Sequence, residues 1–246
     1  MKLQTRSLVT DATLVIRFAR TMRVLSSAPW GGGLRSTRFI LNHQVEANPA
    51  RSLSSKEMSA GRAVSHRDPS TTLRLIASRL GIKEPCVGLM TAVPMTQLVT
   101  GREKAKGLWV ECLATVGVTN AVRAGDSFTS RHRHSRPQNV GTINIVLVTN
   151  ATLSMSALVG AVQVITESKT GVLRDYAVPC WAGRPGATGT GTDAVVIVCP
   201  MRGGRRLRYS GTHTEIGTMI GRVVAGCVRK GLKRAKRWSA RLCERS

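Results

Sequence analysis

Short apolar runs alternate along the chain with longer segments in which apolar residues recur at helical spacing. The short runs are β-branched or apolar and predict strands at residues 13–17, 22–25, 87–93, 108–118 and 194–199. The most continuous run, residues 141–150 (GTINIVLVTN), predicts a strand that is buried on both faces. The segment RFILNHQV fits either a helix or a short strand, and the polar segments 46–70 and 126–139 predict loops.

Three segments predict helices. The first begins at Asp68-Pro69-Ser70 and ends at Gly81. The second extends from about Ser154 to Arg174, and its apolar stripe consists of Met155, Leu158, Val159, Val162, Ile165 and Leu173. The third follows His213 and has Thr214 as its N-cap, with an apolar stripe from Ile216 to Val228.

The mixture of strands and helices predicts an α/β fold, with a layered mixed sheet and flanking helices in a single domain. We expect this domain to occupy residues 1–228 and to be followed by a basic tail, residues 229–246. Hydrophobic residues make up 42% and charged residues 20% of the 246 positions. These values are near globular averages, so the chain can bury a core and wholesale disorder is excluded.

Charge is the unusual feature, because 37 Lys and Arg against 13 Asp and Glu give a net charge of +24. Such a balance attracts polyanions, so one interpretation is a nucleic-acid-associated protein. The alternative, a basic surface on an enzyme, is favoured because the basic residues are spread along the chain. An aromatic content of 4% is also thin for stacking on single strands. We therefore expect nucleic acid to bind only non-specifically, through charge.

The cysteines and the hydropathy pattern bear on the compartment. The six cysteines form no CxxC pair and have no histidine at metal-ligand spacing, which argues against structural zinc and favours buried thiols in a reducing cytoplasm. No apolar stretch reaches 18 residues, so no membrane span is expected. Asp11 and Arg17 interrupt any apolar signal region, and a cytoplasmic location is expected.

The loop at residues 188–193 (TGTGTD) is the first candidate for chemistry. Its glycines and threonines can direct backbone N–H groups and hydroxyls at an anion or a carbonyl oxygen, and Asp193 could be a base or orient one. The alternative is a tight loop whose aspartate caps a turn. His213, just before a predicted helix N-terminus, could be a general base or a surface histidine beside the cap.

Lys169 lies within an apolar stripe, where an ammonium is costly unless it is paired. It could contact a carboxylate in a site, with Glu167 nearby, or extend its stem to solvent near the helix end. Asn120, Asn144 and Asn150 are at or near strand ends and could bind amides or cap turns. There is no P-loop, GxGxxG, GxSxG or HExxH signature.

Seven segments, taken together and in order over residues 20–228, resemble the adenosylcobinamide amidohydrolase family. They are VLSSAPWGGG, VGLMTAV, ATVGVTNAVRAGD, GTINIVLVTNATLS, ITESKT, ATGTGTDAVVIVC and YSGTHTEIGTMIG. The resemblance implies salvage of incomplete corrinoids, by hydrolysis of the amide that joins aminopropanol to a propionate of the corrin ring, giving adenosylcobyric acid. The basic segment 126–139 and the basic tail depart from this pattern.

Under this resemblance we expect His213 as base, Asp193 as its partner, the Gly189–Gly191 backbone as an oxyanion cradle, and support from Glu167 and Lys169. The expected substrate-binding residues are Ser26, Ser27, Gly32, Asn120, Asn144, Asn150, Thr190, Thr192 and Thr212. The partner is a small corrinoid, and no metal or other cofactor is expected to be required. A corrinoid-binding module without hydrolysis, or a metal-dependent water, are the alternatives, and the oligomeric state stays open.

Overall fold

The computed structural model describes residues 5–10, 12–45, 68–126, 141–180 and 183–243, with side chains from residue 7 to residue 236 of these ranges. Its centre is an eight-stranded mixed sheet with the order β4-β3-β2-β11-β8-β6-β5, in which β1 also pairs with β2. The strands are β1 (Thr5–Thr10), β2 (Thr13–Ser26), β3 (Gly33–Gln44), β4 (Cys86–Thr91), β5 (Val99–Ala105), β6 (Leu108–Val116), β8 (Ile143–Thr149) and β11 (Ala194–Pro200).

Two short strand pairs flank this sheet, and helices cover it. The pairs are β7 (Ala121–Val122) with β10 (Gly189–Thr190), and β9 (Thr152–Leu153) with β12 (Arg206–Leu207). The helices are α2 (Pro69–Arg79), the short 3-10 turn η2 (Met95–Gln97), α3 (Met155–Asp175) and α4 (Glu215–Cys243). The chain is thus a single mixed α/β domain with a large sheet flanked by helices, as the sequence predicts.

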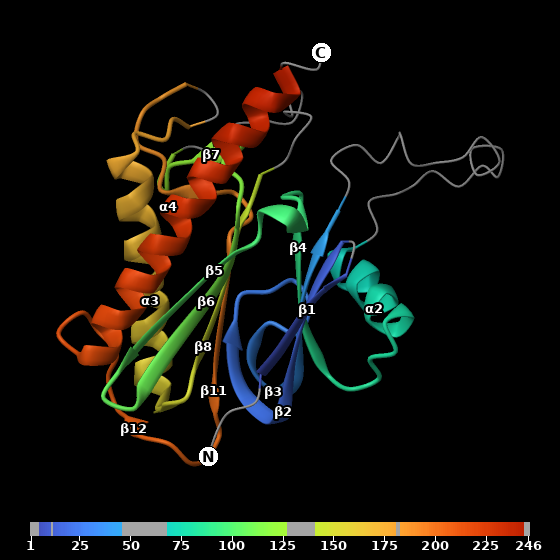
Figure 1. The fold of residues 1–246 in the computed structure, drawn as a ribbon, viewed down its shortest axis with the longest axis vertical. Helices are drawn as coiled ribbons and strands as arrows, with labels where there is room; N and C mark the ends of the chain where they lie inside the picture. Colours follow the sequence, from blue (N-terminus) through green and yellow to red (C-terminus); the bar gives the residue numbers. More distant parts are fainter. Residues whose placement is uncertain (1–4, 11, 46–67, 127–140, 181–182, 244–246) are drawn as a thin grey trace.

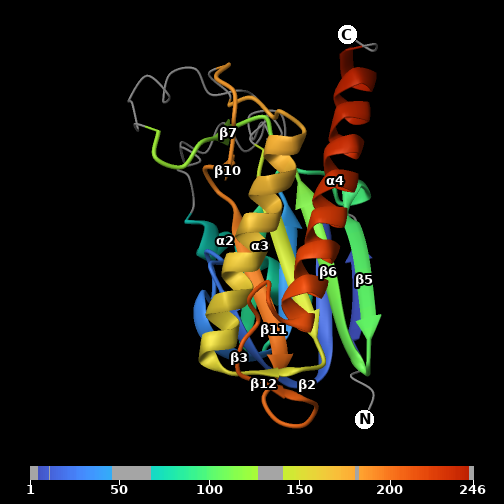
Figure 2. The same cartoon turned by 90° about the vertical axis from the view of Figure 1, so that its left-hand side faces the viewer.

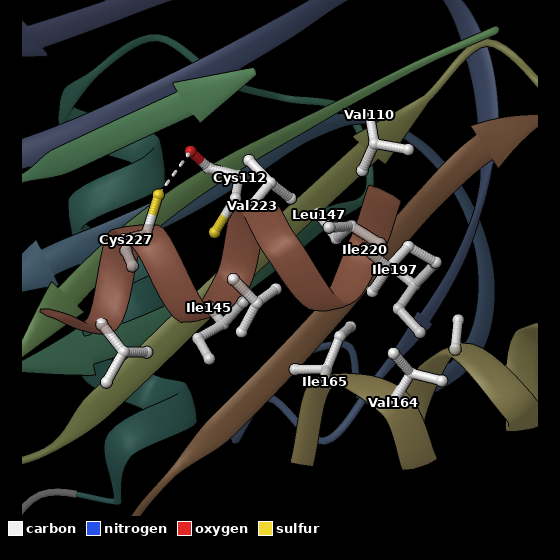
Figure 3. Close-up of a cluster of buried hydrophobic side chains, with 14 of the residues drawn as sticks. Val110, Cys112, Ile145, Leu147, Val164, Ile165, Ile197, Ile220, Val223 and Cys227 are labelled. Carbon is white, nitrogen blue, oxygen red and sulfur yellow. Dashed lines mark hydrogen bonds between the residues drawn. The ribbon is translucent and has the colours of Figure 1, made fainter. Parts of the chain in front are cut away.

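One face of the sheet is covered by α3 and α4. Strands β8 and β11 run parallel, and α3 connects them, crossing back over this face. The core beneath the two helices contains Ile145 and Leu147 of β8, Ile197 of β11, and Ile165 and Ile220 of the helices (Figure 3). These strand residues alternate with others that face the opposite side, which is why β8 is buried along its whole length.

The opposite face is covered by the other half of the same sheet, which folds back over it. Strands β3 and β2 and strand β11 separate β4 from β8 in the sheet order, yet Asn144 of β8 donates a hydrogen bond to the carbonyl of Met90 on β4, at 2.8 Å. The long strand β2, whose pairing with β3 shifts register between Arg17 and Met22, allows the sheet to fold back in this way. A second core fills the space between the two halves, and α2 covers the outer face of β3 and β4 (Figure 1).

Most predicted elements are present. RFILNHQV is part of strand β3, which is one of the two predicted alternatives, whereas β5 is a strand that the sequence analysis does not predict. In α3, Met155 and Val159 are 50% and 54% exposed and so lie outside the buried stripe, whereas Lys169 is buried. Helix α4 continues without a break past residue 228 to Cys243, and the division at that residue stays a prediction. The predicted loops at 46–70 and 126–139 lie largely outside the described residues.

Candidate active site

Most of the segments that resemble the family have a part at one edge of the sheet, whereas YSGTHTEIGTMIG lies at the opposite edge. At the first of these edges, which we call the upper edge from its place in Figures 1 and 2, β8 and β11 begin and β2 and β6 end, as the pairs Val116–Ile143 and Ser26–Val196 show. The pair β7–β10 lies there too. The upper edge therefore gathers polar loops that are far apart in the sequence.

A buried ion pair stands at the centre of the upper edge. Lys169, near the end of α3, approaches Asp193 Oδ2 with its Nζ at 2.5 Å, and their side chains are only 11% and 13% exposed. Oδ2 also accepts the Thr190 backbone N–H at 3.1 Å, and Oδ1 accepts the Thr190 hydroxyl at 2.5 Å and the Ile143 N–H at 3.1 Å. Both carboxylate oxygens are therefore satisfied, and Lys169 is paired rather than extended to solvent.

The Gly/Thr loop at residues 188–193 packs against this ion pair and bonds to it. A Cβ on Gly189 would lie 2.5 Å from Asp193 Oδ2 and 2.8 Å from Lys169 Nζ, so a side chain here would displace the ion pair. The N–H and the hydroxyl of Thr190 both point at Asp193. Thr190, which belongs to the expected oxyanion cradle, thus binds the carboxylate of Asp193 in its own loop, as in the alternative interpretation of an aspartate that caps a turn. The same carboxylate also binds the ammonium of Lys169.

Two threonine hydroxyls adjoin the ion pair. Thr142, buried before β8, donates its hydroxyl to the carbonyl of Thr192 at 2.9 Å and accepts the hydroxyl of Thr192 at 3.0 Å. Sequence analysis named Thr192 but missed Thr142, although its place at the start of a fully buried strand was visible. The two residues tie the beginning of β8 to the loop that carries Asp193.

A cavity of about 390 Å³ opens at the upper edge. Its wall is mostly apolar and comes from segments 92–97, 116–119, 176–179 and 232–236, together with Gly141. Gly141 of this wall directly precedes Thr142 in the chain, but neither Thr142 nor the ion pair itself lines the cavity. Sequence analysis did not anticipate the cavity, because its wall comes from four separate segments.

A buried amide cluster lies on the other side of β8. Asn144 donates its amide to Asn42 Oδ1 at 3.0 Å, and Asn42 donates in turn to the Thr115 hydroxyl at 3.2 Å. Within the described part of the chain, Asn144 Oδ1 and Asn120 Oδ1 are buried and find no hydrogen-bond donor. Asn42 was missed, and its signal was a polar residue inside the apolar run of β3.

The serine- and glycine-rich loop after β2 also reaches the upper edge. Ser26 accepts the Ala28 N–H at 2.9 Å, and Ser27 accepts the N–H of Val195, the second residue of β11, at 3.0 Å. A Cβ on Gly32 would lie 2.5 Å from the Ala28 carbonyl oxygen, so a larger residue here would clash with the backbone. In the structure, these residues shape the loop and fasten it to β11.

His213 is not beside Asp193. It follows β12 and precedes α4, at the lower edge where β8 ends and β9 pairs with β12, whereas Asp193 is at the start of β11. Strands β8 and β11 are parallel, so both begin at the upper edge and end at the lower edge. Asp193 and His213 are therefore separated by about the length of these strands. The sequence hypothesis that pairs them is therefore not supported by the geometry.

Three other expected site residues do not join the ion pair. Thr212 is exposed beside His213 at the lower edge. Asn150 accepts the Trp109 N–H at 2.8 Å and donates to the Gly107 carbonyl at 2.8 Å, which holds the β5–β6 turn in place. Glu167 is exposed, because two residues along a helix place it on the opposite face from Lys169.

The thiols lie away from the cavity. Burial raises the pKa of Cys86 to about 12, and the neighbouring Cys227 thiol, together with burial, raises the pKa of Cys112. The Cys227 thiol also donates to the backbone carbonyl of Cys112 at 3.8 Å (Figure 3). No cysteine of the described residues lines the cavity. Among those residues, moreover, no three His, Cys, Asp or Glu side chains gather as a metal ion would require, and no helix is long and apolar enough to cross a membrane.

Comparison with known proteins gives a match over nearly the whole chain. Residues 2–240 match the sequence profile of the family described as adenosylcobinamide amidohydrolase. A protein of that name from Methanosarcina mazei is 28% identical over 92% of this chain and 96% of its own length. An uncharacterized protein of Methanocaldococcus jannaschii is 27% identical over 89% of this chain and 85% of its own length.

Two solved structures show a distant likeness. A protein of Pyrococcus horikoshii has 8% sequence identity and a TM-score of 0.43, covering 94% of this chain and 83% of its own. The L-aminopeptidase D-Ala-esterase/amidase of Ochrobactrum anthropi has 12% identity and a TM-score of 0.38, covering 95% of this chain and 84% of its own.

Proposed function

The chain belongs to the adenosylcobinamide amidohydrolase family, and from this premise we propose that it hydrolyses the amide between aminopropanol and a propionate of adenosylcobinamide. The products are adenosylcobyric acid and free aminopropanol, so the reaction serves corrinoid salvage. The observation that carries the proposal is the buried Lys169–Asp193 pair at the upper edge, which joins two of the family-like segments, ITESKT and ATGTGTDAVVIVC.

The proposed chemistry follows from what amide hydrolysis requires. Water adds to the carbonyl carbon, the carbonyl oxygen becomes negative in the transition state, and the C–N bond breaks as the amine nitrogen takes up a proton. Lys169 is the one charged side chain in the buried set of the described residues, so its ammonium acts in a low-dielectric setting. We assign it the stabilisation of the developing oxyanion.

Asp193 is a positioning residue in this proposal. It fixes the ammonium of Lys169 through Oδ2 and is itself fixed by Thr190 and by the start of β8. The ammonium therefore needs little reorganisation as charge develops on the substrate. The hydroxyls of Thr142 and Thr192 bond to each other and tie the start of β8 to the loop that carries Asp193.

The surroundings proposed for this enzyme follow from its charge and its thiols. A reducing cytoplasm suits the cysteines, because the five between residues 86 and 227 are all buried and form no disulfide in the described part of the chain. Nucleic acid is proposed to bind only through the net charge of +24, with an affinity that falls steeply as salt rises.

The test is incubation of the purified protein with adenosylcobinamide and, in parallel, with adenosylcobalamin, followed by chromatography and mass detection. Adenosylcobyric acid and aminopropanol are expected from adenosylcobinamide, and the second corrinoid shows whether a complete cobamide is accepted. No product from a demonstrably folded protein, with retained cobinamide binding, would instead indicate a corrinoid-binding module.

A further inference from the structure

We propose that the outer face of helix α4 binds the phosphate backbone of a nucleic-acid duplex. This inference rests on the charge-driven binding of nucleic acid that belongs to the proposed function, but not on the hydrolysis of adenosylcobinamide. It assigns that binding to one surface, whereas net charge alone would spread it over the whole molecule.

Helix α4 carries many basic residues and no acidic ones after its first turn. Between Glu215, in that turn, and Lys236 there is no Asp or Glu. The basic side chains of this stretch are all exposed, namely Arg222, Arg229, Lys230, Lys233, Arg234 and Lys236. Within the described part of the chain, none of the six is in an ion pair. Their positive charges are therefore not neutralised there by a carboxylate of the protein.

Three of these residues form a straight row, which we call the basic row. With about 3.6 residues per turn, Arg222, Arg229 and Lys233 fall within about 40° of one another around the helix axis. The basic row is about 17 Å long at about 1.5 Å per residue, and one strand of B-form DNA carries about five phosphates over that length. Residues 216–236 include no aromatic residue on which the bases of a single strand could stack, which favours a duplex.

The apolar face of α4 is already occupied. Ile220, Val224 and Val228 are buried in the core, and the helix packs against β5, β6 and α3 (Figure 2). An amphipathic helix that lies on a membrane inserts its apolar face among the lipids, which α4 cannot do while it covers the sheet. The exposed basic ridge that remains therefore suits a phosphate backbone better than a lipid surface.

The charges of the basic row oppose the stability of the helix. Arg229 and Lys233 are four residues apart, a spacing at which like charges on a helix surface repel each other. Both lie well before the end of the helix at Cys243, and the favourable effect of the helix dipole on cations is confined to the last turn. A bound polyanion removes this repulsion, so the row is stabilised by a ligand rather than by the fold.

The test compares two triple variants that lose the same kinds of charge. The row variant combines Arg222→Gln, Arg229→Gln and Lys233→Gln. The matched control combines Arg74→Gln, Arg79→Gln and Lys83→Gln, which replace exposed residues on α2 or shortly after it. Glutamine has a helix propensity close to those of lysine and arginine, and the two variants have equal net charge.

The affinity of each protein for a random-sequence DNA duplex of about 20 base pairs is measured by fluorescence anisotropy between about 50 and 200 mM salt. We expect the row variant to bind at least about tenfold more weakly than the wild type. The slope of log K against log salt should be smaller by about 2–3, because each lost phosphate contact removes about 0.9 from it. The control should stay within about threefold of the wild type and keep its slope.

Equal weakening of the two variants would leave binding through net charge in place but overturn its assignment to α4. No binding of the duplex by the wild type would overturn both, whether or not the protein binds phosphatidylserine vesicles in a parallel assay. Urea denaturation checks for a structural role. The midpoint of the row variant should equal or exceed that of the wild type, because like charges are removed, and a lower midpoint would contradict the proposal.

Discussion

Removing either partner of the Lys169–Asp193 pair should destabilise the fold, and the two losses should differ. A buried ion pair that loses one partner typically costs about 3–5 kcal/mol, because the remaining charge is uncompensated. In Lys169→Met, Asp193 keeps three donors, namely the Ile143 N–H and the N–H and hydroxyl of Thr190. We therefore expect a loss near the lower end, about 3 kcal/mol.

The reverse change leaves more groups unsatisfied. In Asp193→Ala, the ammonium of Lys169 and the three donors all lose their acceptor. We expect a loss of about 5 kcal/mol, at the upper end of the same range. The difference between the two variants is thus a direct consequence of the hydrogen bonds around the carboxylate.

Urea denaturation at pH 7, in low and in high salt, measures both free energies of unfolding. Because the pair is buried, the losses should change little with salt. Under native conditions kcat of Lys169→Met should fall by about 10²–10³, the usual effect of removing one oxyanion-stabilising donor. A loss of stability below about 1 kcal/mol in both variants, as found for exposed pairs, would refute the reasoning.

Three further changes probe the rest of the account. Gly189→Ala should lose about 1–3 kcal/mol in urea denaturation and most of its turnover, because its Cβ meets Asp193 and Lys169, whereas Gly191→Ala, with nothing within 4 Å of its Cβ, should change neither. His213→Ala should keep turnover within about twofold, since it lies at the lower edge, and a loss of 10²-fold would return this histidine to the chemistry. Burial lowers the pKa of His43 below 6.5, so the free energy of unfolding should decline as pH falls from that value through the lower folded one. In His43→Gln this part of the pH profile should be flatter.

The sequence predicted the elements that have strong local patterns. Strand β8 is a continuous apolar run, and α3 and α4 have Ser154 and Thr214 as N-caps, each accepting an N–H from three residues further on. Strand β5 was missed because it contains three consecutive charged residues, Arg102, Glu103 and Lys104, and Val99 is its one buried residue, as is possible for a strand at the edge of a sheet. The folding back of the sheet depends on pairing across most of the chain, which no local pattern encodes.

The site was predicted residue by residue but not in its arrangement. Lys169 and Asp193 were both named, the first because a charge in an apolar stripe requires a partner. That they bind each other follows from the crossover of α3, which places its end beside the start of β11. Thr142 was missed, because its role depends on neighbours contributed by distant segments.

Mass detection of the products of adenosylcobinamide tests the central claim most directly, with wild type and Lys169→Met compared at equal concentrations of folded protein. We predict adenosylcobyric acid and aminopropanol in equal amounts from the wild type, and at least about 10²-fold slower formation by the variant. No product from the wild type, or equal rates from the two proteins, would contradict the account.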